Sequence, residues 1–125
     1  KGYIDLHNRF IKTEEIATML KQCSICVCPY TDATQSGVIM TSFALSKPVI
    51  ASNVGGLGEM IDEGKSGLLV EPKNPVALAN AILKLLKNPI ELARMESYIH
   101  ESYYKGKDSW LSIADKYIDF YNKIL

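Results

Sequence analysis

Short apolar runs alternate with helical patterns along almost the whole chain. Apolar runs without a helical period indicate strands, and apolar residues that recur every three or four positions indicate amphipathic helices. The expected strands lie within residues 3–11, 24–30, 47–52 and 68–72. The expected helices are 13–22, 35–46, a short one within 53–67, 74–88, 89–104 and 109–125.

Local signals mark where two of these helices begin. Thr13 suits an N-cap position, and Glu14 and Glu15 follow in the first turn, where acidic side chains interact favourably with the helix dipole. Asn74 can cap the clearest helix of the chain, and Pro75 takes its first helical position, where no backbone N–H is needed.

Strands that alternate with helices predict βαβ units and a parallel sheet. About four strands are visible before three consecutive helices, whereas a complete doubly wound domain usually has five or six strands. We therefore expect an α/β fold: part of a Rossmann-like doubly wound parallel sheet, with helices on both faces and C-terminal helices. Residues 1–125 would form one domain, the later part of a larger unit, with 109–125 as its terminal helix.

The first residue is Lys1 rather than Met, so we expect the natural chain to begin earlier. Strands absent from the sheet would leave an open edge, and such edges pair with other strands. We therefore expect that the open edge can support self-association.

Charge and composition narrow the range of partners. Lys and Arg number 14, Asp and Glu number 14, and the formal net charge is zero. Proteins that bind nucleic acid usually carry a basic excess or stripe, so we expect no nucleic-acid partner. No apolar run approaches the roughly 20 residues that a membrane span needs.

Three cysteines, Cys23, Cys26 and Cys28, cluster in the sequence CSICVC. The C-x-x-C spacing occurs in redox and zinc sites, but the second pair of thiols or histidines that a zinc site needs is absent. Because the neighbours Ile25 and Val27 are apolar, we expect buried strand thiols and no metal site. Unpaired cysteines fit a reducing compartment, and we expect a cytoplasmic protein.

Two loops follow predicted strands at the sheet edge where open parallel sheets bind ligands. They are YTDATQSG (30–37) and SNVGGLGE (52–59), and both lead into helices, whose N-termini favour phosphate. The small residues in each loop would let backbone amides face a ligand closely. The alternative, that the glycines only make tight turns, stays open from spacing alone.

The stretch KPVIASNVGGLGEMIDEGKSGLLVEPKNPVALANAILKLLKNP (47–89) resembles the carboxy-terminal domain of GT-B glycosyltransferases, especially glycosyltransferase family 4, the glycosyl transferases group 1. The similarity runs from about Phe10 to the C-terminus. It implies a domain that binds a nucleotide-diphosphate sugar, next to a separate amino-terminal domain that binds the acceptor. It also implies transfer with retention of configuration and no bound metal or other cofactor, with basic groups and helix N-termini stabilising the leaving diphosphate.

The sequence departs from this family where the family has a Glu, seven residues, and a second Glu. These positions fall on Ala33 and Thr41, of which only Thr41 offers a hydroxyl. Two interpretations follow: a subgroup in which DATQSG replaces the usual loop, or a lost donor site. In the first, the two loops and the resemblance together predict these donor- or phosphate-binding residues, with no catalytic residue assigned: Asp32, Thr34, Gln35, Ser36, Gly37, Thr41, Gly55 and Gly56. For Asp32 the alternative of a solvated loop acid or turn cap stays open.

The resulting expectation is the donor-binding part of a retaining hexosyltransferase that acts on a glycan or lipid acceptor. It would work in the cytoplasm or at the inner face of the membrane, in polysaccharide biosynthesis, and these 125 residues alone would be inactive because the acceptor domain and a basic diphosphate-binding pair lie outside them. The alternatives are a non-catalytic GT-B-like scaffold or binding domain and, as a minor one, a nucleotide-sugar epimerase of the same architecture.

Overall fold

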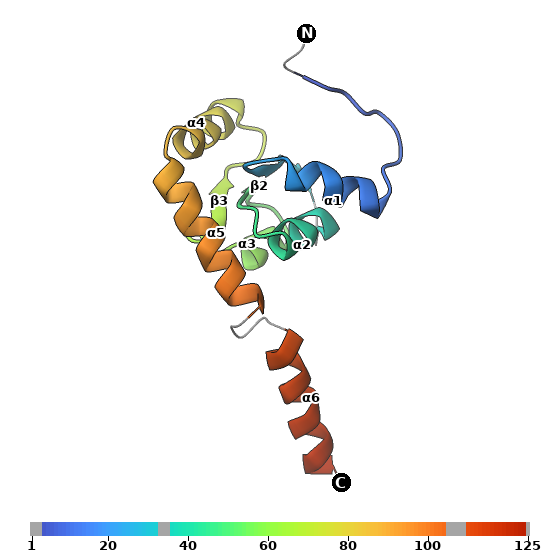
Figure 1. Ribbon diagram of the computed structural model, residues 1–125. Helices are drawn as coiled ribbons and strands as arrows, with labels where there is room; N and C mark the ends of the chain where they lie inside the picture. The colour runs from blue at the N-terminus through green and yellow to red at the C-terminus, as the bar shows by residue number, and fades with distance from the viewer. Residues whose placement is uncertain (1–3, 33–35, 105–109, 125) are drawn as a thin grey trace.

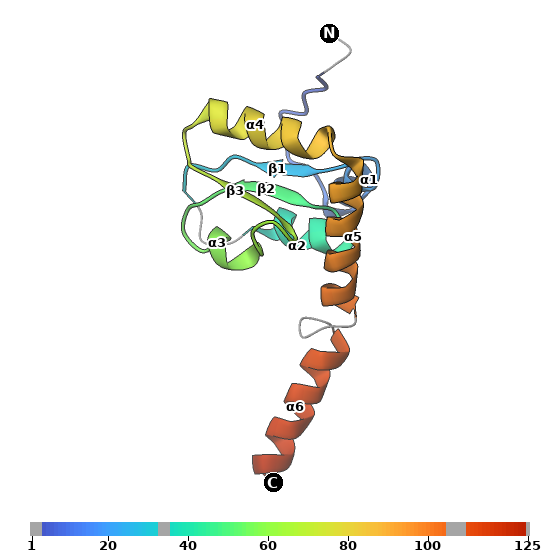
Figure 2. The same cartoon turned by 90° about the vertical axis from the view of Figure 1, so that its left-hand side faces the viewer.

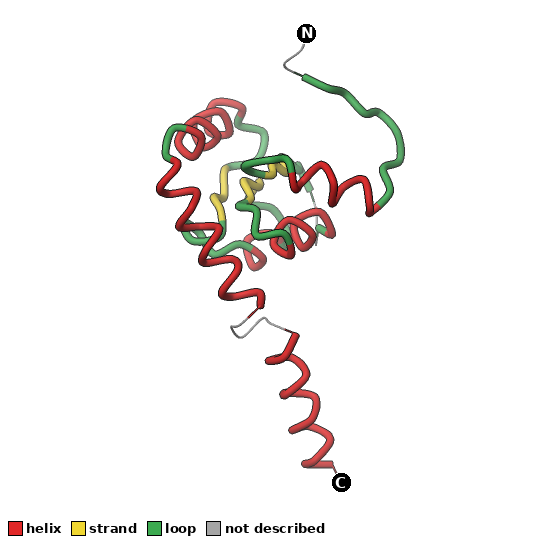
Figure 3. Tube along the Cα trace, viewed as in Figure 1, coloured by secondary structure: helices red, strands yellow, loops and turns green. Residues whose placement is uncertain are grey.

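The computed structural model describes residues 4–32, 36–104 and 110–124 (Figure 1). Strands and helices alternate through the first part of the chain, and three helices follow (Figure 3). The predicted α/β alternation is therefore confirmed. The elements are α1 (Thr13–Lys21), β1 (Cys26–Cys28), α2 (Gly37–Ala44), β2 (Val49–Ser52), α3 (Leu57–Met60), β3 (Gly67–Val70), α4 (Pro75–Leu86), α5 (Pro89–Tyr104) and α6 (Trp110–Ile124).

The sheet contains three parallel strands in the order β1-β2-β3, fewer than the four expected. Val27 of β1 is paired with Ile50 of β2, and Ile50 is paired with Leu68 of β3. All four residues of β2 are buried. Because a central parallel strand is covered on both faces, its sequence is a continuous small or apolar run rather than an alternating one.

The strand predicted within 3–11 is wrong for the residues that the structure describes there. Residues 4–12 contain neither strand nor helix, and they run away from the sheet (Figure 1). A strand needs a neighbour for its backbone N–H and C=O groups, and none of the β-pairings of β1, β2 and β3, nor the isolated bridge between Glu63 and Gly67, involves residues 4–12. Ile4, Leu6 and Phe10 consequently remain more than four-fifths exposed.

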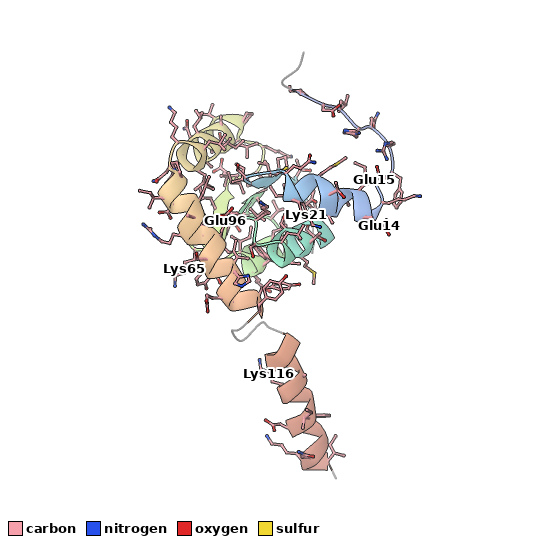
Figure 4. All side chains as sticks on the ribbon, in the orientation of Figure 1. Glu14, Glu15, Lys21, Lys65, Glu96 and Lys116 are labelled. Atoms are coloured by element: carbon pink, nitrogen blue, oxygen red, sulfur yellow. The ribbon has the colours of Figure 1, made fainter. Side chains whose placement is uncertain are left out.

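Helix α1 begins at Thr13, so its N-cap is Lys12 and not Thr13. The backbone N–H of Lys12 instead donates to Oε1 of Glu15 at 3.3 Å. Glu14 and Glu15 lie at the start of this helix and Lys21 at its end, which matches the helix dipole (Figure 4). The acidic first turn was therefore predicted correctly, although the capping residue was not.

Helices cover both faces of the sheet (Figure 2). Cys28, Val49 and Ala51 belong to a cluster on the face of α1, α2 and α3. Ile50 and Leu68 belong to a second cluster on the opposite face, with residues of α4 and α5. Alternation of side chains along the strands separates the two clusters, and the doubly wound arrangement is confirmed.

Helix α5 contacts both α2 and α4 and so touches both layers. The hydroxyl of Tyr98 donates to Oδ2 of Asp62 at 2.7 Å, and that of Tyr104 donates to the carbonyl oxygen of Ala44 at 2.6 Å. Helix α6 extends away from the sheet (Figures 1 and 2). Among the described residues, no helix is both long enough and apolar enough to cross a membrane.

Candidate functional site

The carboxyl ends of the three strands share one edge of the sheet, on the left of Figure 2. The chain leaves β1 toward α2, leaves β2 toward α3 and leaves β3 toward α4. Three loops therefore meet at this edge, and two of them are the loops predicted from the sequence. Open parallel sheets bind ligands in this position.

Ser36 begins α2 as its N-cap. The side chain is buried, its Oγ accepts the backbone N–H of Ile39 at 3.2 Å, and the Tyr30 hydroxyl lies 3.3 Å away. The hydroxyl of Ser36 is thus engaged in holding the loop to the helix start. Its value to a ligand would lie in fixing where the free first-turn amides point, not in a side-chain contact of its own.

Gly37 is the first residue of α2 and leaves space in front of the helix N-terminus. A Cβ built on Gly37 would meet no atom of the described residues within 4 Å. The fold therefore does not require glycine here for reasons of space. First-turn N–H groups of a helix lack intrahelical partners and, with the dipole, attract phosphate.

Of the other residues predicted for this loop and helix start, the structure describes Asp32 and Thr41. Thr41 lies one turn into α2, and its hydroxyl donates to the carbonyl oxygen of Gly37 at 2.8 Å, so that proton is already used. Asp32 is exposed at the edge. Ala33, Thr34 and Gln35 lie outside the described residues.

The Gly55–Gly56 turn lies at the same edge and joins β2 to α3. Gly55 has φ of +49°, in the left-handed region that favours glycine, whereas Gly56 has φ of −82° and caps α3. The tight-turn interpretation therefore accounts for Gly55. It does not account for Gly56, whose backbone conformation any residue can adopt.

The third loop, after β3, completes a pocket that the sequence did not predict. The pocket has a volume of about 200 Å³ and lies where all three strands end. Lys73 in this loop has φ of +59°, which is unusual for a residue with a side chain. The sequence feature that could have indicated this pocket is Lys73, a basic residue between the end of a predicted strand and the predicted helix cap Asn74. The lining residues are Pro29, Thr31, Ser52, Val70, Glu71, Lys73, Asn74, Pro75 and Leu78.

None of the three cysteines lines the pocket. Cys26 and Cys28 are buried with their Sγ atoms 3.9 Å apart, as predicted, but Cys23 is exposed and follows α1 rather than lying in a strand. The contact with Cys26, together with burial, raises the pKa of the Cys28 thiol. The described part of the chain holds no cluster of three or more metal-ligating side chains.

Comparisons with curated proteins find glycosyltransferases. An uncharacterized glycosyltransferase of Methanocaldococcus jannaschii is 43% identical over 75 residues, which cover 60% of this chain and 21% of that protein. The D-inositol 3-phosphate glycosyltransferase of Corynebacterium urealyticum is 29% identical over 119 residues, which cover 93% of this chain and 28% of that protein. The chain thus spans less than a third of these relatives.

Solved structures show the same fold. Sucrose-phosphate synthase from Thermosynechococcus elongatus superposes with a TM-score of 0.75 at 31% identity, over 91% of this chain and 28% of that one. Anabaena HepE in complex with UDP superposes with a TM-score of 0.70 at 21% identity, over 84% of this chain and 29% of that one. The GT-B resemblance of the fold is confirmed.

The family model described as glycosyl transferases group 1 matches residues 2–88, well over half of the chain. This match covers all three strands and both loops predicted to hold the donor. The chain belongs to the glycosyl transferases group 1 family.

Proposed function

We propose that this chain is the donor-binding part of a retaining glycosyltransferase that moves a hexose from a nucleotide-diphosphate sugar to a glycan or lipid acceptor. Family membership and the relatives named as glycosyltransferases support the general activity. Anabaena HepE, whose structures hold UDP and UDP-glucose, supports a nucleotide sugar as the ligand of this fold. The acceptor would be bound by an amino-terminal domain of the full-length protein, in the cytoplasm or at the inner membrane face, without a cofactor.

The open N-terminus of α2 carries this proposal. No described residue fills the space in front of Gly37 at the start of the helix. Ser36 fixes the first turn, because its Oγ accepts the backbone N–H of Ile39. A diphosphate placed there would meet free amides and the positive end of the helix dipole. The same groups would stabilise the charge that develops on the leaving nucleotide diphosphate as the sugar departs.

The second candidate is a GT-B-like scaffold that has lost its donor site. It is favoured by Thr41, because its hydroxyl proton is donated to the helix backbone and no carboxylate replaces the family's second Glu. Under this alternative the space in front of Gly37 would be filled by another part of the protein rather than by phosphate.

Thermal unfolding of the protein expressed from its complete gene, with UDP, GDP, ADP and CMP, separates the two candidates. A ligand that binds only the folded state raises the unfolding temperature. We expect one nucleotide diphosphate to raise it selectively and thereby to name the donor nucleotide. No shift with any nucleotide, in a well-folded sample, supports the scaffold.

The variant Gly37→Ala tests where that nucleotide binds. Because the added methyl group meets no described atom, the variant should fold normally, yet the methyl group would occupy the space proposed for phosphate. We expect the nucleotide-dependent shift to disappear. Ser46→Gly, beyond the other end of α2, is the matched control and should keep the full shift.

Transfer itself is tested with the matching nucleotide sugar and a lipid or glycan acceptor. NMR of the product reports the anomeric configuration, and retention is expected. Inversion would overturn the retaining mechanism, and interconversion of the nucleotide sugar without an acceptor would indicate an epimerase.

A further inference from the structure

The pocket after β3 lies on a different face of the sheet from the proposed donor site. Val70 and Leu78, which line it, pack with the cluster of α4 and α5, whereas Ser36 and Gly37 begin α2 on the opposite face. Both sites share the carboxyl edge of the sheet. Thr31 of the loop that leads to α2 also lines the pocket, so the two sites are neighbours, and the competition experiment below tells a molecule in the pocket from a nucleotide bound at α2.

Ser52 provides the observation that points to a ligand. It is only 3% exposed, and it lies two residues after Ile50, so its side chain points to the same face as Ile50, toward α4 and the pocket. Within the described residues its hydroxyl has no hydrogen-bond partner. Its Oγ is not among the fully buried atoms without a partner, so the hydroxyl is open to the pocket that Ser52 lines and is free to bond to a molecule there.

Charges of both signs line the same pocket. Lys73 brings an ammonium group, and α4 begins beside it with its positive dipole end, although the side chain of Asn74 already accepts the N–H of Ala77 at 3.0 Å. Glu71 adds a carboxylate. A simple anion would be attracted by Lys73 and α4 but repelled by Glu71, whereas a molecule with both charges would satisfy both groups.

The rest of the lining sets the size and polarity of the ligand. Pro29, Val70, Pro75 and Leu78 give the pocket an apolar wall. A volume of about 200 Å³ is smaller than the sites that hold complete cofactors, which range from about 300 to 1,000 Å³. The pocket therefore suits a small molecule with one apolar group rather than a whole nucleotide sugar.

We propose that this pocket binds a small zwitterion of the α-amino-acid class with an apolar side chain. Its carboxylate meets Lys73 and the start of α4, its ammonium group meets Glu71, and the Ser52 hydroxyl pairs with one of its polar groups. The site goes beyond the donor site of the proposed function and does not depend on it.

Saturation-transfer NMR titrations of the full-length protein test the proposal with three related probes. L-phenylalanine carries both charges, 3-phenylpropanoate only the carboxylate, and phenethylamine only the ammonium group. We expect saturable binding of L-phenylalanine and at least tenfold weaker binding of the other two. Equal binding of all three, or none by L-phenylalanine, overturns the proposal.

Two variants locate the binding without disturbing the fold. Ser52→Ala removes a hydroxyl that has no described partner, and Lys73→Asn removes the charge while keeping a residue that tolerates positive φ. We expect binding to weaken about fivefold in the first and about tenfold in the second, as loss of one hydrogen bond and of one ion pair predicts. Lys87→Asn, at the far end of α4, is the matched control.

Two further results would decide against the assignment. Unchanged L-phenylalanine binding in both Ser52→Ala and Lys73→Asn would place the amino acid elsewhere. Displacement of L-phenylalanine by a nucleotide that stabilises the protein would show that the two sites are one. Failure of every nucleotide to bind, with L-phenylalanine still bound, would remove the proposed donor site but leave this pocket standing.

Discussion

Gly67 of β3 lies directly against the backbone of Val49 of β2. The two residues are register partners in the parallel sheet, and a Cβ built on Gly67 would overlap the carbonyl oxygen of Val49. Gly67→Ala must therefore push the strands apart, and we expect it to lower the free energy of unfolding by roughly 3 kcal/mol, at the upper end of the usual cost of overpacking. Urea denaturation measures this change.

Gly37→Ala is the matched control for that loss. Its added methyl group has open space among the described residues, and alanine favours a helix over glycine by roughly 0.5–1 kcal/mol. The control should therefore be as stable as the parent or more so. Equal stability of the two variants would contradict the close approach of Gly67 to Val49.

Ser46 has a left-handed backbone, with φ of +60°, in the short turn between α2 and β2. This conformation costs a residue with a Cβ roughly 1–2 kcal/mol. Glycine avoids that steric cost, but it loses more conformational entropy on folding. We expect Ser46→Gly to raise the free energy of unfolding by roughly 0.5–1 kcal/mol, the difference between these effects. Ser46→Ala keeps the strain, so a similar gain in that variant would exclude backbone relief as the cause.

The hydroxyl of Tyr98 donates to Asp62 across 36 residues of sequence. It joins α5 to the segment that leads into β3. Removing the hydroxyl in Tyr98→Phe should cost about 1 kcal/mol, the usual net value of a hydrogen bond. A double-mutant cycle with Asp62→Ala, which removes the acceptor, isolates the pair, and a coupling energy near zero would show that the bond contributes nothing in solution.

The contact between Arg9 and Glu15 makes the start of the chain sensitive to acid. The hydrogen bond from Arg9, at 2.7 Å, and that from the Lys12 N–H lower the pKa of Glu15. A depressed folded-state pKa stabilises the fold above the unfolded-state value, about 4.3, and that contribution is lost as the pH falls through the folded-state pKa. Residues 4–12 should therefore be held to α1 more weakly in acid, by the small amount that an exposed ion pair contributes.

An NMR titration of the Glu15 carboxyl carbon measures this directly. We expect Arg9→Gln to return the pKa of Glu15 toward its ordinary value, because the guanidinium is the largest cause of the shift. Lys21→Gln, at the other end of α1, removes one positive charge without touching Glu15 and should change its pKa less. Equal effects of the two variants would point to general charge rather than to the Arg9 contact.

The sequence predicted α4 well because its signals are local. Asn74 does cap the helix through the Ala77 N–H, and Pro75 is its first residue. The strand within 3–11 was wrong because strand formation depends on a partner elsewhere, which a local pattern cannot reveal. Side-chain chemistry alone likewise suggested Thr13 as the N-cap. In the structure the N-cap is Lys12, and Glu15 accepts the backbone N–H of Lys12.

The candidate site was predicted only in part for the same reason. Both glycine-containing loops lie at the predicted sheet edge, since parallel strands bring their carboxyl ends together. The pocket was missed because it combines Thr31, Ser52 and Lys73 from three separate strand ends. Their convergence depends on strand order and on which face each side chain occupies, and neither is encoded within any one segment.

Helix α5 has a consequence for how the protein opens. Its residues Met95 and Leu92 pack with the cluster on the α4 face, while its last residue, Tyr104, bonds to the end of α2 on the other face. If the helices on either face of the sheet lose their packing, α5 is loosened as well. The backbone amides of α2 and of β3 should therefore exchange with deuterium at the same limiting rate, as one cooperative unit. Tyr104→Phe should separate the two, and α2 should then exchange first.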